Sequence, residues 1–110
     1  MKGMTEERAI QYLQDTLFVV GGKWKLPVLR AIHGGSYRFR DIQRSVPLIT
    51  PRVLSKELKH LEENKLVIRT VYHSPLAVEY KVGKYTESLL PVIKEMILWG
   101  KNHRKKIRSK

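Results

Sequence analysis

Apolar residues in the first third of the chain recur every three to four positions, the spacing of one face of an α-helix. Thr5 predicts the start of a first helix, which Gly21-Gly22 interrupts. A second helix is expected to begin near residues 23–25 and to end at Gly34-Gly35, with Pro27 in its first turn. The positions predicted to lie on the apolar faces of these two helices are Ile10, Leu13, Leu17, Val20, Trp24, Val28, Leu29 and Ile32.

Two further helical segments follow, joined by a tight connection. We expect residues 36–38 to be extended and residues 39–45 to form a brief helix. Thr50-Pro51 is a strong helix start, because a capping hydroxyl precedes a proline at the first helical position. This helix should run to about Asn64. Its apolar face is predicted to consist of Leu54, Leu58 and Leu61.

The hydrophobic pattern changes from helical to strand-like in the second half of the chain. Residues 66–72 and 77–82 are two β-rich runs separated by four residues, which predicts a hairpin. A last helix is expected from about Lys84 or Thr86, with Pro91 in its first turns or at a kink. The order helix, helix, short helix, long helix, strand, strand, helix indicates a mainly α winged helix-turn-helix fold.

The helix from Thr50 to Asn64 also carries the candidate chemistry, because the face opposite its leucines is polar and basic. A helix that follows a short turn and has a polar first half is typical of major-groove readers. Arg52, near the helix start, is the residue best placed to read guanine. The full predicted DNA-binding set is Arg38, Arg40, Thr50, Arg52, Ser55, Lys56 and Lys59. The alternative is an ordinary solvated face, since basic residues occur on many exposed helices.

The charge of the chain favours a polyanionic partner. The 110 residues hold 22 Lys and Arg against 10 Asp and Glu, a net charge of +12. Six basic residues and no acid lie in residues 101–110, which we expect to form a flexible basic tail. Without them the net charge is still +6. Such an excess raises the affinity for nucleic acid through phosphate contacts that release counterions.

Several classes of protein are made improbable by the sequence. No apolar run approaches the ~20 residues that span a bilayer, and the first residues are acidic rather than signal-like, so a cytoplasmic protein is expected. The absence of Cys excludes disulfides, thiolate zinc sites and thiol-based sensing. The four His residues show no ligand spacing and no catalytic constellation stands out. We therefore predict no metal, no cofactor and no enzymatic activity.

The last helix is too apolar for a single interface. Its apolar residues occupy more than half of the helical wheel, whereas a surface helix of a monomer shows a narrower stripe. We therefore expect a homodimer, and a helix buried within a monomer is the alternative. The predicted interface residues are Leu13, Leu17, Leu90, Ile93, Ile97 and Trp99.

Four motifs in order resemble those of the HxlR-type winged-helix transcriptional regulators. They are GGKWKLPVL, RFRDIQRSVPLITPRVLSKELKHLEENKLVIR, VEY and LLPVIKEMILWG, and the resemblance covers about Gln11 to Gly100. It implies a bacterial dimeric regulator of operator DNA, with the helix from Thr50 to Asn64 as reader and the hairpin as wing. It also implies dimerisation through the N- and C-terminal helices. Some relatives sense electrophiles through a Cys-Pro pair, and this chain has Gln11-Tyr12 there.

The chain is thus predicted to be a sequence-specific regulator that binds a two-fold operator in double-stranded DNA as a homodimer. It should form a single domain over residues 1–110, with a family-like core at about 11–100 and the basic tail at 101–110. A small-molecule effector is a further candidate partner, and no membrane partner is expected. The alternatives are a winged-helix module that binds an acidic protein and a dimer that binds small molecules.

Overall fold

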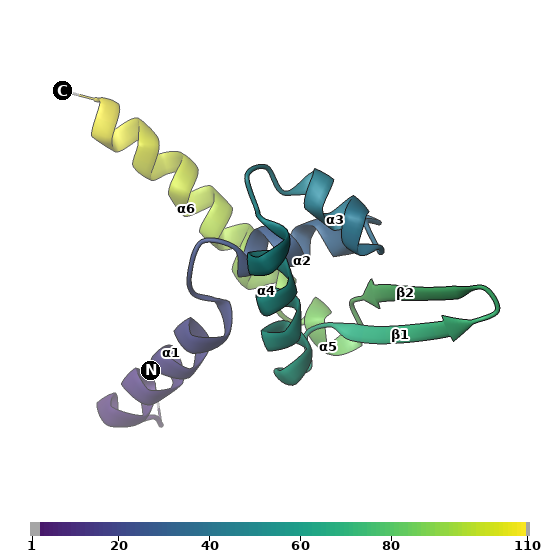
Figure 1. Ribbon diagram of the computed structural model, residues 1–110. Helices are drawn as coiled ribbons and strands as arrows, with labels where there is room; N and C mark the ends of the chain where they lie inside the picture. Colours follow the sequence, from purple (N-terminus) through teal and green to yellow (C-terminus); the bar gives the residue numbers. More distant parts are fainter. Residues whose placement is uncertain (1–2, 110) are drawn as a thin grey trace.

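Three central helices carry the rest of the fold in the computed structural model, which describes residues 3–109 (Figure 1). The helices are α1 (Glu6–Val20), α2 (Lys25–His33), α3 (Phe39–Ser45), α4 (Pro51–Glu63), α5 (Lys84–Glu87) and α6 (Leu90–Arg108), and the strands are β1 (Ile68–His73) and β2 (Leu76–Lys81). Helices α2, α3 and α4 cluster at the centre, the hairpin extends from one side, and α1 and α6 project from the other. Within the described residues, no helix is long and apolar enough to cross a membrane.

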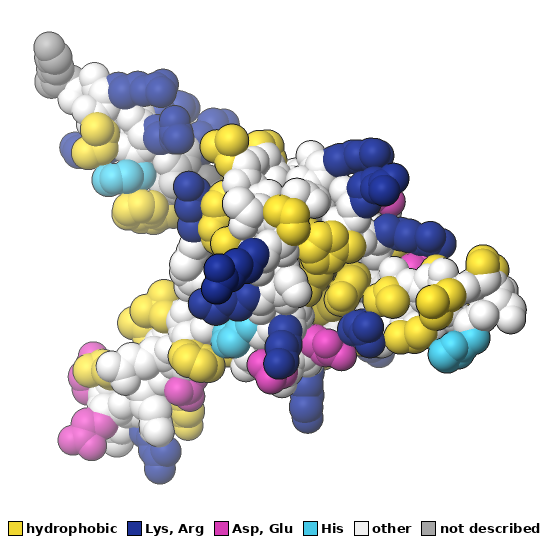
Figure 2. All heavy atoms as spheres, in the orientation of Figure 1, with side chains coloured by type: hydrophobic (Ala, Val, Ile, Leu, Met, Phe, Trp, Pro, Cys, Tyr) yellow, Lys and Arg dark blue, Asp and Glu magenta, His cyan; other side chains and the backbone are white. Residues whose placement is uncertain are grey.

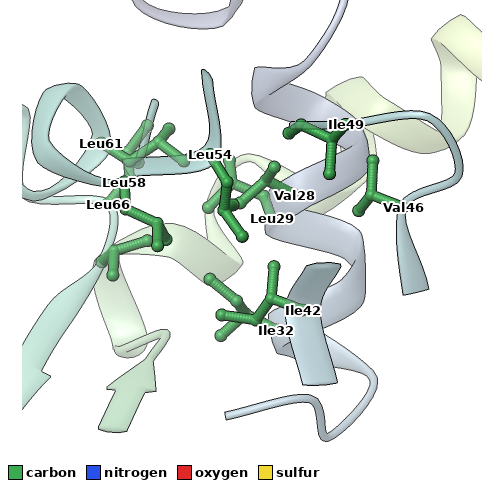
Figure 3. Packing of buried hydrophobic residues seen from close by; sticks show 11 residues of the cluster. Val28, Leu29, Ile32, Ile42, Val46, Ile49, Leu54, Leu58, Leu61 and Leu66 are labelled. Carbon is green, nitrogen blue, oxygen red and sulfur yellow. The ribbon is translucent and has the colours of Figure 1, made fainter. Parts of the chain in front are cut away.

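The core lies where α4 packs against α2 and α3. The three leucines predicted for the apolar face of α4 are at most 1% exposed, which confirms that prediction. Figure 3 shows them pointing toward the apolar side chains of α2, with α3 and the following turn closing one side. The buried cluster consists of Val28, Leu29, Ile32, Ile42, Val46, Ile49, Leu54, Leu58, Leu61, Leu66 and Val67.

Local signals place the helix ends where the sequence predicts them. The Oγ1 atom of Thr5 accepts a hydrogen bond from the Arg8 amide (3.1 Å) and caps α1. The Oγ1 atom of Thr50 caps α4 in the same way by accepting from the Val53 amide (3.3 Å). Helix α1 ends at Gly21, where a side-chain Cβ would collide with a carbonyl oxygen of the last turn. These caps satisfy amide groups that a helix start leaves without partners.

The hairpin is the predicted wing, with a shorter turn than the sequence suggested. The strands are antiparallel and pair from Ile68↔Lys81 to His73↔Leu76, so only two residues form the turn instead of four. The amide of Tyr80 on β2 donates a hydrogen bond to the carbonyl oxygen of Tyr37 (2.8 Å). The extended segment before α3 therefore lies beside the wing and fixes its position.

The end of the chain differs from the prediction in two ways. The expected single last helix is two helices, α5 and α6, because Pro91 cannot donate to the carbonyl of Glu87, the last residue of α5. The expected flexible tail at 101–110 is wrong for the residues up to Arg108, which continue α6. Lys and Arg are good helix formers, and positive charge near a helix C-terminus is favourable.

One ion pair lies at the edge of the core. The Nζ atom of Lys25, the first residue of α2, lies 3.4 Å from each carboxylate oxygen of Glu57 on α4. Their side chains are only 15% and 11% exposed. Neither residue was singled out from the sequence, because nothing local indicates that positions 32 apart meet.

Replacing Leu58 by Ala should lower the free energy of unfolding by about 2–5 kcal/mol, because it removes buried methyl groups and leaves a cavity. Urea unfolding followed by circular dichroism, at one fixed protein concentration, measures this change. The control is Leu76→Ala at a position that is 76% exposed, where a change within about 0.5 kcal/mol is expected. Equal losses for the two variants would contradict this description of the core.

Candidate nucleic-acid interface

All the residues predicted to bind DNA are exposed on the surface of α3 and α4 or at the starts of these helices. Arg38 is the residue immediately before α3, and Arg40 lies in the first turn of that helix. Thr50 caps α4, and the remaining four residues lie on its solvent side. The structure therefore places the whole set on α3, on α4 and at their starts, two helices that lie next to one another in the central cluster (Figure 1).

The buried face of α4 determines which side chains reach solvent. Since Leu54 and Leu58 are anchored in the core, the residues one and two positions after Leu54 point outward. Arg52 is exposed in the first turn, where a long side chain can reach the edge of a base. The hydroxyl oxygen of Thr50 accepts the capping hydrogen bond, and its hydrogen remains available to a phosphate oxygen.

Arg38 differs from the other members of the set because it contacts the wing. Its Nε atom lies 3.7 Å from a carboxylate oxygen of Glu79 on β2, and the Arg38 side chain is 57% exposed. The other oxygen of Glu79 lies 3.6 Å from the Nζ atom of Lys81. Exposed pairs of this kind contribute little to stability. Here the carboxylate holds two cations at the junction of the wing and α3.

Two further residues were missed by the sequence analysis. Gln43 and Arg44 lie on α3 beside Arg40 and, together with the turn after α3, line a shallow hollow of about 430 Å³. Arg44 is 71% exposed, with one loose contact of 3.9 Å to Asp41. The signal was present in the sequence, because Arg40 and Arg44 are four positions apart and share a helix face.

The charges are separated along the molecule. Figure 2 shows Lys and Arg side chains over α3, over α4 and along the outer half of α6. Acidic side chains gather on α1 and toward the far end of α4. The positive side of α4 is thus its N-terminal half, the part that follows the turn. A basic surface at a helix start suits contact with phosphates.

A second group of predicted residues leaves apolar surface in solvent. Leu13 and Leu17 on α1 are 60% and 56% exposed, and Ile97 and Trp99 on α6 are 49% and 67% exposed. Leu90 and Ile93 are half-buried, and none of the described residues of α6 is fully buried. Large apolar side chains exposed on two helices are typical of surfaces that contact another molecule.

The histidines do not gather into a site. Residues 3–109 contain no group of three or more His, Asp or Glu side chains that could hold a metal ion. His60 instead packs edge-to-face against Phe18, with ring centroids 5.3 Å apart, and so joins α4 to α1. The ring of His103 stacks on Trp99 at 4.7 Å within α6.

Known proteins resemble this chain over most of its length. The family model described as HxlR-like helix-turn-helix matches residues 19–108. The HTH-type transcriptional regulator YybR of Bacillus subtilis (strain 168) is 38% identical over 98 residues, which cover 88% of this chain and 78% of YybR. YdzF of the same organism, also an HTH-type transcriptional regulator, is 40% identical over 87 residues, covering 77% of this chain and 80% of YdzF.

A solved structure supports the same comparison. The redox regulator HypR in its reduced form superimposes with a TM-score of 0.80 at 36% identity. The match covers 90% of this chain and 99% of HypR. The resemblance includes the central helices, the wing and the projecting helices, so it extends well beyond the helix-turn-helix itself.

Replacing Arg52 by Ala should cost about 1–3 kcal/mol of binding free energy on the duplex that the protein selects from a random pool, and much less on random DNA. The reason is that a base contact is lost only where the correct base is present. Arg44→Ala is the matched control, because a phosphate contact on α3 should weaken both duplexes by similar factors. Fluorescence anisotropy with both duplexes measures the four changes. If Arg52→Ala weakened both equally, Arg52 would contact phosphate instead of base.

Proposed function

The chain belongs to the HxlR-like helix-turn-helix family of DNA-binding transcriptional regulators, and we propose that it acts as a homodimer on a two-fold operator. The observation that carries the proposal is α4, whose leucine face is buried while its basic first half is exposed beside the turn. Two copies would present two α4 helices to successive major grooves. In this proposal, the bound dimer regulates transcription by occupying the operator, and we propose no catalytic step.

The residues of the proposed DNA-binding surface have different roles. Arg52 in the first turn of α4 contacts a base edge, while Lys56 and Lys59 farther along the exposed face contact phosphates. Arg40 and Arg44 on α3 contact the backbone on the other side of the turn. The wing lies on the far side of α3, where Arg38 and Lys81 meet the backbone of the flanking DNA. Paired half-sites would lie about 34–36 Å apart, one helical turn of DNA.

Selection of bound duplexes from a random pool, followed by recovery of bound fragments from a genome, tests this function. The expected result is an enriched palindrome whose affinity falls steeply with salt, by a slope of about 0.9 for each phosphate contact. Absence of any enriched sequence would contradict the proposal. Binding to an acidic protein, with no preference among duplexes, would favour the interaction-module alternative instead.

The apolar faces of α1 and α6 support assembly into a dimer. Five large apolar or aromatic residues on α6 are between 43% and 67% exposed, and α1 contributes a comparable exposed face. The acidic first turn of α1 and the basic end of α6 are of opposite charge, which favours contact between the two helices across a dimer. The proposed interface residues are Leu13, Leu17, Leu90, Ile93, Ile97 and Trp99.

Replacing Ile97 or Trp99 by Asp should convert a micromolar dimer into monomer or aggregate, because a charge would enter the apolar interface. Operator binding should weaken in the same variants, since a monomer holds only one reader. Lys84→Asp, at an exposed position at the start of α5 and outside the proposed interface, is the control and should remain dimeric. Sedimentation velocity decides the matter, and a folded wild-type monomer at high concentration would contradict the proposal.

A small-molecule effector is the second part of the proposal. A groove of about 440 Å³ lies between α2 and α6, with Leu29, Ile93 and Ile97 among its apolar walls. Arg30 and Lys94 add positive charge to its lining, which contains no acidic residue. The groove is within the size range of small-molecule sites and suits an organic anion with an apolar body. With no Cys in the chain, such an effector would act without forming a thiol adduct.

Diamide and benzoquinone should leave the operator affinity unchanged, because the chain has no thiolate to oxidise or alkylate. The HypR protein that this chain resembles is described as a redox regulator, so the comparison is informative. Anisotropy titrations before and after mild treatment measure the effect. Rapid loss of binding that a thiol reverses would contradict the prediction, whereas slow loss through Met oxidation is a separate process.

A further inference from the structure

Leu48, in the turn between α3 and α4, is exposed to an unusual degree. It is 88% exposed, the highest exposed fraction among the large hydrophobic residues of the described range. Its neighbours in the turn behave in the opposite way, since Val46 and Ile49 are 3% and 5% exposed. These two residues anchor the turn in the core, and the two side chains between them, Pro47 and Leu48, are exposed to solvent. Leu48 therefore contributes no burial to folding.

The backbone of Leu48 is also unfavourable. Its φ angle is +71°, in the left-handed region. This conformation has a free-energy cost of about 1–2 kcal/mol for most residues other than Gly, Asn and Asp. Among residues 3–109, the one other non-glycine residue with positive φ is Lys65, at +64°. The positive φ of Lys65 has a structural reason. Lys65 lies just after the end of α4, and its conformation lets the Leu66 amide donate a hydrogen bond to the Leu61 carbonyl (2.9 Å). A glycine at position 48 would satisfy the turn with less strain, so stability does not account for the leucine.

The position of Leu48 points to a role in recognition. It lies two residues before the cap of α4 and four before Arg52, the proposed base reader. With Arg40, Gln43 and Arg44 it lines the shallow hollow at the end of α3. An isobutyl group among cationic and amide side chains cannot accept or donate a hydrogen bond. On the DNA edge of the molecule, it can gain free energy only from an apolar partner.

We propose that Leu48 packs against the C5-methyl group of a thymine in the major groove and is a specificity-determining residue for that base. The C5-methyl is the apolar group that distinguishes an A·T pair in this groove, and apolar side chains contact it. Strained backbone positions cluster where a side chain is held for function. The inference rests on the proposed function, because it requires α4 to enter the major groove of an operator.

The test uses the full chain and the operator obtained by selection, with single thymines replaced by deoxyuridine. This change removes the methyl group and keeps base pairing. One thymine in each half-site should be sensitive, and its replacement in one half-site should weaken wild-type binding about fourfold, the value for burying one methyl-sized group. Leu48→Gly should bind the operator more weakly than wild type and should be insensitive to deoxyuridine at that position.

Two controls separate recognition from folding. The thermal midpoint of Leu48→Gly should be equal to or higher than that of wild type, because glycine adopts the left-handed conformation without strain. Leu48→Asn keeps a side chain that tolerates this backbone region and should also lose the sensitivity to deoxyuridine. Tyr85→Ala, at a position 65% exposed on α5, should keep the full wild-type sensitivity.

The outcomes distinguish this inference from the function on which it rests. If no thymine shows a methyl effect, or if Leu48→Gly and Leu48→Asn keep the wild-type response, the inference is overturned while operator binding stands. If no operator is enriched at all, the proposed function fails first. Loss of the methyl effect in both Leu48 variants, with random-DNA affinity unchanged, supports the role of Leu48 in base selection.

Discussion

The packing of the leucine face of α4 against α2 is the interaction on which the rest of the structure depends. Leu54, Leu58 and Leu61 occupy one side of a regular helix. Once this side is buried, the opposite side of the helix must face solvent. The Lys25–Glu57 pair adds a second constraint at the edge of the same contact. A largely buried charge is costly without its partner, so the pair disfavours displacement of α4 relative to the start of α2.

The turn before α4 is held by the same core. Val46 and Ile49 insert into it on either side of two exposed residues, Pro47 and Leu48, and the Thr50 cap starts the helix immediately afterwards. The wing is attached separately, through the hydrogen bond between Tyr80 and Tyr37 and the contact of Arg38 with Glu79. The backbone segments that carry the basic side chains of α3, α4 and the wing are thus attached to the same core, and fixed relative positions are a requirement for reading bases.

The projecting helices connect assembly to this arrangement. Helix α1 carries exposed apolar residues on most of its length, yet Val20 near its end is buried. The edge-to-face contact of Phe18 with His60 joins α1 to α4 directly. Helix α6 borders the groove whose other wall is α2. In the proposed dimer, both helices that contact the second copy also touch the helices that orient the reader.

Interactions within about four residues were readable from the sequence. The caps at Thr5 and Thr50, the leucine spacing of α4 and the switch to a strand pattern are of this kind, and they predicted the order of elements and the basic face. The division of the last helix at Pro91 was only partly foreseen. The basic end was expected to be flexible because of its run of like charges, yet Lys and Arg are good helix formers and continue α6 to Arg108.

The tertiary structure decided what depends on distant contacts. The Lys25–Glu57 pair joins positions 32 apart, and the contact of Tyr37 with Tyr80 joins an extended segment to a strand beyond α4. Leu48 belongs to the same class. An apolar residue in a sequence is expected inside, and its exposure and left-handed backbone follow only from the anchoring of Val46 and Ile49 by a core assembled from several helices. Periodicity specifies which residues of one element share a face, whereas packing specifies which faces meet and which side chains are left outside.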